Sequence, residues 1–206
     1  MMTVKLAIVY YSTTGTNYQL AQWAAEGAKE VGAEVTIYRV PELAPQSVID
    51  GNPAWKSHLE QTKDVPVVTP ENIVEADAII FSTPTRFGNI ASQMKQFLDT
   101  TGGIWAQGKT VNKVVSAMTS AQNSHGGQEA TILNLYTTMY HWGAIVVAPG
   151  YTDPSLFAAG GNPYGTSVSV DGNNEIVGDK EAYKAAIIHQ TKRVITVADW
   201  VKKGSS

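Results

Sequence analysis

The chain has 206 residues, a hydrophobic fraction of 43% and a formal net charge of -3. This length fits one folded α/β domain, and so small a charge leaves no footprint for nucleic acid. The lack of cysteine excludes disulfides, thiolate catalysis and cysteine-ligated metals; it fits a cytoplasmic protein whose redox chemistry comes from a cofactor. We expect neither a signal peptide nor a membrane span, because the first apolar run has no cleavage site and none reaches about 18 residues.

Short β-branched runs alternate along the chain with longer stretches of helical periodicity. This alternation predicts strands at 5–11, 33–40, 76–83, 113–120 and 143–150. It predicts helices over 20–31, 92–101, about 128–141 and about 179–202. Parallel strands joined by helices need cover on both faces, so we expect an α/β fold with a doubly wound, five-stranded parallel sheet in three α/β/α layers.

Two segments interrupt this alternation, 41–70 with five prolines and 151–178, which is rich in Gly, Asn, Ser and Tyr. We interpret both as loop insertions within a single domain that spans 1–206. Long loops are uncommon unless they have a function, so we expect these two to serve a site or a contact between subunits.

Three loops should meet at one end of the sheet, because every strand-to-helix loop of an open parallel sheet emerges at its carboxyl edge. They are 12–17 (STTGTN), 83–89 (TPTRFGN) and 119–127 (TSAQNSHGG). All three are rich in hydroxyls, amides and glycine. The sequence therefore predicts a ligand site built from hydrogen-bond donors.

The first loop precedes a helix, whose unpaired N–H groups and positive dipole end attract an anion. Ser12, Thr13, Thr14 and Thr16 add hydroxyl donors, and Gly15 permits a tight turn. The loop has neither the lysine of a triphosphate-binding loop nor the three glycines of a dinucleotide fingerprint. A phosphate monoester held by neutral donors, such as that of a mononucleotide flavin, fits this pattern; simple capping of the helix is the alternative.

The motifs YYSTTGTN, PTRFGN, FLDTTGGIW, GGQE and NPYG occur in this order, and with them the chain resembles the flavodoxin-like NAD(P)H:quinone oxidoreductases of the WrbA type. The resemblance covers nearly the whole chain and implies a tightly but non-covalently bound FMN. It implies that the FMN contacts are Ser12, Thr13, Thr14, Gly15, Thr16, Asn17, Pro84, Thr85, Arg86, Phe87, Gly88, Asn89, Thr119, Ser120, Ala121, Gln122, Asn123, Gly126 and His141. Thr14 and Trp105 would lie beside the substrate, with Trp105 reaching across a subunit boundary, although the family usually has an aromatic residue at the position of Thr14.

The same resemblance implies an enzyme that reduces quinones to hydroquinones by two electrons, with a hydride passing from NADH or NADPH through flavin N5. It also implies a homotetramer. Two other functions fit the residues: a flavodoxin-type electron carrier without turnover of its own, and an FMN-binding regulatory or interaction protein that uses the long loops for a partner. The mild charge and the two insertions count against the carrier.

No residue is a certain catalytic group, because the cofactor would supply the chemistry. Arg86 is the only Arg or Lys in the three loops, and we expect its fixed charge to stabilise the reduced flavin; a structural salt bridge is the alternative. By the resemblance, His141 has an electrostatic or proton-transfer role. Trp105 and Tyr151 are candidate walls for a flat quinone, and we expect no metal because the histidines lack metal-ligand spacing.

Overall fold

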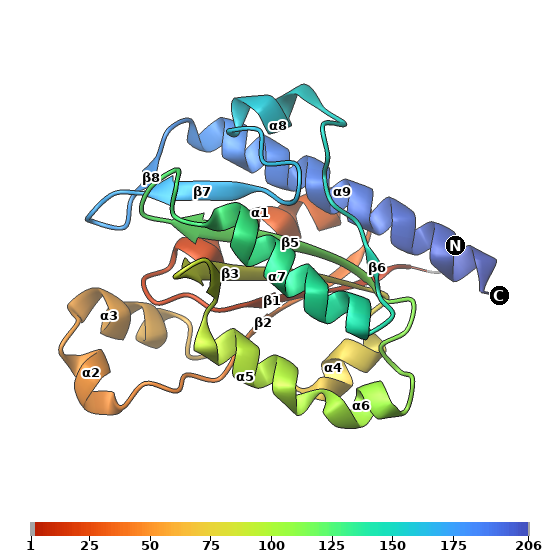
Figure 1. The fold of residues 1–206 in the computed structure, drawn as a ribbon, viewed down its shortest axis with the longest axis horizontal. Coiled ribbons are helices and arrows are strands. Elements are labelled where there is room, and N and C mark those ends of the chain that lie inside the picture. The colour runs from red at the N-terminus through yellow and green to blue at the C-terminus, as the bar shows by residue number, and fades with distance from the viewer. Residues whose placement is uncertain (1–2, 206) are drawn as a thin grey trace.

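The computed structural model of the chain describes residues 3–205 and places a mostly parallel sheet between two layers of helices (Figure 1). Its central strands are, in spatial order, β2 (Glu34–Arg39), β1 (Lys5–Tyr10), β3 (Ala78–Arg86) and β5 (Val114–Ala121). Every residue of β5 is buried, as expected for a central parallel strand with helices on both faces. The strand order reverses between β1 and β3, where open α/β sheets bind their ligands.

Two hydrophobic clusters, one on each face of the sheet, hold the helical layers. On one face, α1 (Thr16–Glu30) and α9 (Lys180–Gly204) pack against the even-numbered residues of β1, such as Ile8. The odd-numbered residues, such as Val9, face the other layer, since successive strand side chains point to opposite faces. The helices of that layer are α4 (Pro70–Glu75), α5 (Ser92–Thr100), α6 (Gly102–Ala106) and α7 (Gln128–His141). Within residues 3–205, no helix is both long and apolar enough to cross a membrane.

The first four predicted strands and all four predicted helices are confirmed, with ends that differ slightly. The predicted strand at 143–150 is only partly right, because it is reduced to β6 (Ile145–Val146), which pairs with the start of β5. The chain then leaves the sheet and returns as β7 (Ser167–Val170), parallel to the end of β5. The fifth strand position is therefore divided. With β4 (Asn89–Ile90) and β8 (Ile176–Val177), the sheet formed by residues 3–205 has eight strands instead of five, in the same α/β class.

The gap in the divided strand is filled by side chains. Gln190 of α9, which is 1% exposed, donates to Ser116 Oγ at 2.8 Å and to the Ala117 carbonyl at 2.9 Å. Its Oε1 accepts from Thr166 N at 2.8 Å. From the other face, the Tyr136 hydroxyl accepts from Ala117 N. These contacts satisfy both the N–H and the carbonyl of Ala117, where no strand lies beside β5.

The two segments expected to be loops contain regular elements. Residues 41–70 include α2 (Gln46–Asp50) and α3 (Pro53–Gln61), which form an arm beside the carboxyl ends of the strands (Figure 1). Residues 151–178 include α8 (Pro154–Ala158), which packs on α9, and the antiparallel pair β7 and β8. Short helices and a hairpin therefore replace the irregular loops of the sequence-based expectation.

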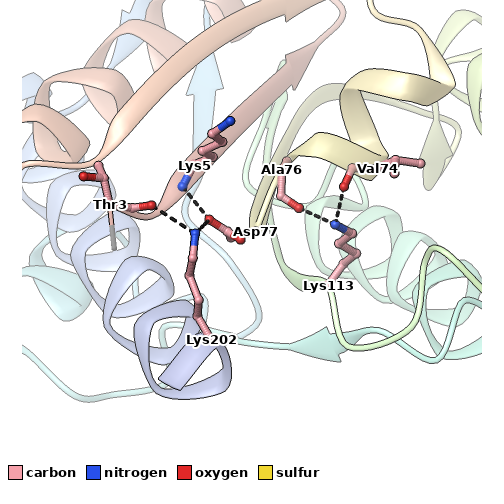
Figure 2. Close-up of polar contacts among 7 residues, drawn as sticks. All are labelled: Thr3, Lys5, Val74, Ala76, Asp77, Lys113 and Lys202. Atoms are coloured by element: carbon pink, nitrogen blue, oxygen red, sulfur yellow. Dashed lines mark hydrogen bonds and ion pairs between the residues drawn. The ribbon is translucent and has the colours of Figure 1, made fainter. Parts of the chain in front are cut away.

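At the end of the sheet where the parallel strands begin, lysine side chains bond to a carboxylate and to backbone carbonyls (Figure 2). Lys113 Nζ donates to the carbonyls of Val74 at 2.6 Å and Ala76 at 2.5 Å, and burial lowers the pKa of this ammonium. Asp77 Oδ2 accepts from Lys5 N at 2.8 Å and from Lys202 Nζ at 2.7 Å. These contacts are structural, and the large open cavity lies at the opposite end, where the strands finish.

Candidate functional site

An open cavity of about 710 Å³ lies at the carboxyl edge of the sheet. The loops that follow β1, β3 and β5 line it, as the sequence predicts. The predicted residues in its wall are Ser12, Thr13, Thr14, Thr16, Asn17, Pro84, Thr85, Arg86, Phe87, Ser120, Ala121, Gln122, Asn123 and Gly126. Among the described residues of this wall there is no carboxylate, and Arg86 is the only cation. A cavity of this size and charge suits a flat ligand with an anionic group.

The loop between β1 and α1 forms one end of the cavity. Gly15 adopts a left-handed conformation with φ of +104°, and its N–H donates to Ser12 Oγ at 2.9 Å. No side chain among the described residues makes a cap hydrogen bond to the first turn of α1, so the structure gives the simple capping alternative no support. The N–H groups of the first turn, together with the hydroxyls of Thr13, Thr14 and Thr16, can therefore bind an anion.

A buried hydrogen-bond network joins the first turn of α1 to β3 and β5 behind this loop. Asn17 is 1% exposed; its Nδ2 donates to Ser82 Oγ at 3.2 Å, and its Oδ1 accepts from Ser120 Oγ at 2.7 Å. Ser82 Oγ also donates to the Asn17 carbonyl at 3.0 Å. The Asn17 amide is thus already used to hold the loops after β1 and β5 against β3. Its contribution to the site is to position the other residues.

The second loop is a tight hairpin between β3 and β4. Arg86 pairs with Asn89, and the two turn residues Phe87 and Gly88 both have positive φ, +53° and +75°. A two-residue turn of this type matches the twist of the flanking strands, but it strains a residue with a side chain. Phe87 bears that strain and is fully exposed at the rim of the cavity. Strained residues concentrate at functional sites, which fits its position.

The hairpin touches the third loop backbone to backbone. Gly127 has φ of +89°, and a Cβ added there would lie 2.8 Å from the Gly88 Cα. A hydrogen bond of 2.5 Å between the hydroxyls of Thr85 and Thr131 links the same two segments. The spacing between the two loops is therefore fixed by glycine, since any larger residue at 127 must push them apart.

The Arg86 guanidinium ties the hairpin to the first loop. Its Nη1 donates to the Thr85 carbonyl at 2.9 Å, and its Nη2 donates to Thr13 Oγ1 at 3.0 Å. Within residues 3–205 Arg86 makes no ion pair, so the salt-bridge alternative is not supported. No carboxylate of the described residues neutralises its charge. The guanidinium lies at the edge of the cavity, where it can attract an anionic ligand.

Some predicted residues lie outside the cavity wall. Thr119 is buried and donates to the Thr83 carbonyl at 2.7 Å, so it braces the strand ends. Gly88 forms the hairpin turn, and Asn89 lines a neighbouring groove. His141 and Trp105 are exposed at the far end of α7, where Trp105 Nε1 donates to the His141 carbonyl at 2.8 Å.

Within one chain, His141 and Trp105 do not reach the cavity. Helix α7 starts next to the cavity and has 14 residues, so its far end lies roughly 20 Å away along the helix axis. Tyr151 stacks on Phe157 with ring centroids 4.9 Å apart, also outside the cavity. Any contact of these residues with a ligand in the cavity requires a second subunit.

The sequence analysis missed four residues of the cavity wall. They are Asn52, Val170, Gly172 and Asn174, all from the two segments interpreted as insertions. The sequence does contain a signal for Val170, Gly172 and Asn174. Residues 168–177 read VSVDGNNEIV, in which β-branched residues flank an Asp-Gly pair, and this pattern is typical of a β-hairpin. The two insertions thus contribute to the rim of the site.

A buried histidine supports the first loop from behind. His58 of α3 is 5% exposed, packs against the rings of Tyr10 and Tyr18, and would lie 3.5 Å from a Cβ added at Gly15. Burial lowers the pKa of His58 and raises the pKa of Tyr10 to about 12. Both groups are therefore neutral near pH 7, and the support that they give the loop is packing.

Comparison with protein families gives a match over most of the chain. A family model described as NADPH-dependent FMN reductase matches residues 4–153. A protein of Deinococcus radiodurans named NAD(P)H dehydrogenase (quinone) is 54% identical, covering 93% of this chain and 94% of its own length. One with the same name from Aromatoleum aromaticum is 45% identical, covering 82% of this chain and 84% of its own.

Solved structures share the fold at lower identity. A WrbA-like flavodoxin from Agrobacterium tumefaciens superposes with a TM-score of 0.64 and 21% identity, covering 96% of this chain and 99% of its own. A flavodoxin from the domain Archaea superposes with a TM-score of 0.57 and 19% identity, covering 97% and 99%. These neighbours show that the fold is flavodoxin-like.

Proposed function

This chain belongs to the NADPH-dependent FMN reductase family, and on that basis we propose that it is an FMN-dependent NAD(P)H:quinone oxidoreductase. The observation that carries the proposal is the cavity at the carboxyl edge, where three loops offer neutral donors and a single guanidinium without a carboxylate. Relatives at 54% and 45% identity are named for this reaction. An electron carrier or a regulatory FMN protein has no comparable support.

The residues of the cavity fit FMN. Its phosphate needs an end of the cavity with several donors and no negative charge, and the uncapped start of α1 with the Thr13, Thr14 and Thr16 hydroxyls supplies them. Its flat ring needs the two loops beside the cavity to be held at a fixed spacing, and the close approach of Gly127 to Gly88 sets that spacing. A neutral phosphate site suits a group that stays bound through turnover and does not react.

FMN, when bound, supplies the chemistry by accepting a hydride from the nicotinamide and delivering two electrons to the quinone. The residues of the chain bind and orient. Asn17 holds the start of α1 against β3 and β5, and the strained turn places Phe87 in the cavity wall. Arg86 places a permanent positive charge at the rim, which favours ligands and states with added negative charge.

We also propose that the chain works as a homotetramer in the cytoplasm. Trp105 and His141 are adjacent at the far end of α7, and they can contribute to a substrate site only from a neighbouring subunit. The outer face of α7 supports this idea, because it exposes Leu133 and Tyr140, and the exposed Trp105 bonds to its last residue. Large exposed apolar side chains gathered in this way mark contact surfaces. Thr14, in the cavity wall, would line the same substrate site.

The test is to purify the protein and record its absorption spectrum before and after heating. We expect flavin bands, with the pigment released by heat, and oxidation of NADH or NADPH in the presence of a benzoquinone well above the rate of free FMN. Flavin bands without nicotinamide oxidation would instead identify an electron carrier or a binding protein. Gel filtration with light scattering tests the tetramer, and a monomer would leave Trp105 without the proposed role.

A further inference from the structure

A second groove lies directly beside the proposed FMN cavity. Its volume is about 720 Å³, and it shares Thr13, Arg86 and Phe87 with the first cavity. The residues in its wall are Tyr11, Thr13, Trp55, Arg86, Phe87, Asn89, Ile90, Ser92, Gln93 and Lys95. A ligand that occupies the first cavity can therefore extend into this groove past the hairpin tip. The mechanism described above gives the groove no role.

One wall of the groove is held rigidly by the half-buried carboxylate of Glu42. Its Oε2 accepts from Tyr11 Oη and from Trp55 Nε1, both at 3.1 Å. Its Oε1 accepts from Gln93 Nε2 at 2.8 Å and from two backbone N–H groups. The Trp55 ring, on α3, is thereby fixed against the main body of the protein. An aromatic ring fixed before binding loses little entropy when a flat group stacks on it.

The charged side chains that line the groove are cations, and the Glu42 carboxylate behind them already accepts five hydrogen bonds. Arg86 and Lys95 lie in its wall, and no Asp or Glu is among the described residues of that wall. Lys95 pairs with Asp99, but both are exposed, and such pairs are worth little and are easily exchanged. Aromatic rings together with two cations favour a ligand that has a flat base and phosphates.

We propose that this groove binds the adenosine phosphate end of the nicotinamide donor, with adenine stacked on the Trp55 indole and the phosphates near Arg86 and Lys95. The inference rests on the proposed function, because a donor whose nicotinamide enters the FMN cavity must place its other half outside it. Another cavity of about 500 Å³ lies near α8, but it has no lining residue in common with the first and contains Glu129. Of these two, the groove at Trp55 is the one that shares wall residues with the proposed FMN cavity.

The first experiment measures binding of ADP to the FMN-loaded protein by equilibrium dialysis. Trp55→Ala should weaken ADP binding about tenfold, the effect of losing one stacked base. Trp55→Phe also loses the hydrogen bond to Glu42 but retains an aromatic ring, so it should bind ADP nearly as well as the wild type. Trp200→Ala is the matched control, since Trp200 is 62% exposed on α9, and it should change nothing. Equal ADP binding by the wild type and Trp55→Ala, or no ADP binding at all, would overturn the proposal.

The second experiment compares two donors in steady-state kinetics. Trp55→Ala should raise the KM for NADH or NADPH about tenfold while leaving kcat/KM for reduced nicotinamide mononucleotide, which lacks adenosine, unchanged. ADP should compete with the full donor. Equal losses with both donors would mean that Trp55 only supports the fold, and would overturn the proposal. Trp55-dependent ADP binding by a protein that oxidises no nicotinamide would refute the proposed function but support the groove.

Discussion

The contact between Gly127 and Gly88 predicts the effect of adding one methyl group to the site. Gly127→Ala places a Cβ 2.8 Å from the Gly88 Cα, closer than backbone atoms tolerate, at a position with φ of +89°. A left-handed alanine costs about 1 kcal/mol, and overpacking against backbone adds about 2 kcal/mol. We therefore expect a loss of unfolding free energy of about 3 kcal/mol in total.

The same substitution should weaken FMN binding. Since the hairpin must move away from the third loop, at least one of its contacts with the cofactor should be lost, and a loss of about 1.4 kcal/mol is tenfold in Kd. Urea unfolding of the apoprotein and FMN titration followed by quenching of flavin fluorescence measure the two effects. Gly108→Ala is the matched control, because Gly108 has φ of +70° but nothing within 4 Å of an added Cβ.

Gly108→Ala should lose about 1 kcal/mol of stability and keep its FMN affinity. If Gly127→Ala matched this control in both measurements, the backbone contact would not set the spacing of the two loops.

Three further predictions follow from contacts around the site. Gln190→Leu should lower the unfolding free energy by about 2–4 kcal/mol in urea titrations, because it leaves the backbone at the gap in β5 unpaired; the flavin spectrum should not change. Arg86→Ala should lower the two-electron flavin midpoint potential by about 30 mV, equivalent to 1.4 kcal/mol. Arg86→Lys keeps the charge, so its potential should stay closer to that of the wild type. An unchanged potential in Arg86→Ala would rule out the electrostatic role. Burial holds the pKa of His58 below its ordinary 6.5, so the unfolded state takes up a proton before the folded state does as the pH falls. The unfolding free energy of the wild type should therefore drop more between pH 7.5 and 5.5 than that of His58→Gln. An equal drop in both proteins would contradict this prediction.

The central part of the fold was predictable because its signals are local. Buried parallel strands are continuous apolar runs, and the three loops that follow them are hydroxyl-rich or glycine-rich, so the convergence of the Thr13, Arg86 and Ser120 loops follows from topology alone. Thr13, Thr14 and Thr16 are half-buried and line the cavity at the start of α1, as the predicted anion site requires. These inferences need no knowledge of long-range side-chain contacts.

The divided strand was not predictable in the same way. GAIVVAPG is a β-branched run like any buried strand, and what shortens it is the return of the chain at Thr166, stabilised by Gln190 from a helix far along the sequence. The rim residue Asn52 was missed for a similar reason, since its place depends on how α3 docks through Glu42. Such features arise from tertiary contacts, which a pattern of hydrophobicity does not encode.

The divided strand also shortens the strands at one edge of the sheet. An exposed sheet edge with a long row of unpaired backbone groups can recruit a strand from another molecule and begin aggregation. Beyond β5, the described sheet ends in segments of only two to four residues, and side chains occupy the space between them. At the other edge, Arg39 of β2 bonds to the segment at Pro66 and Val68. The divided margin therefore offers no long, regular template for the addition of a strand.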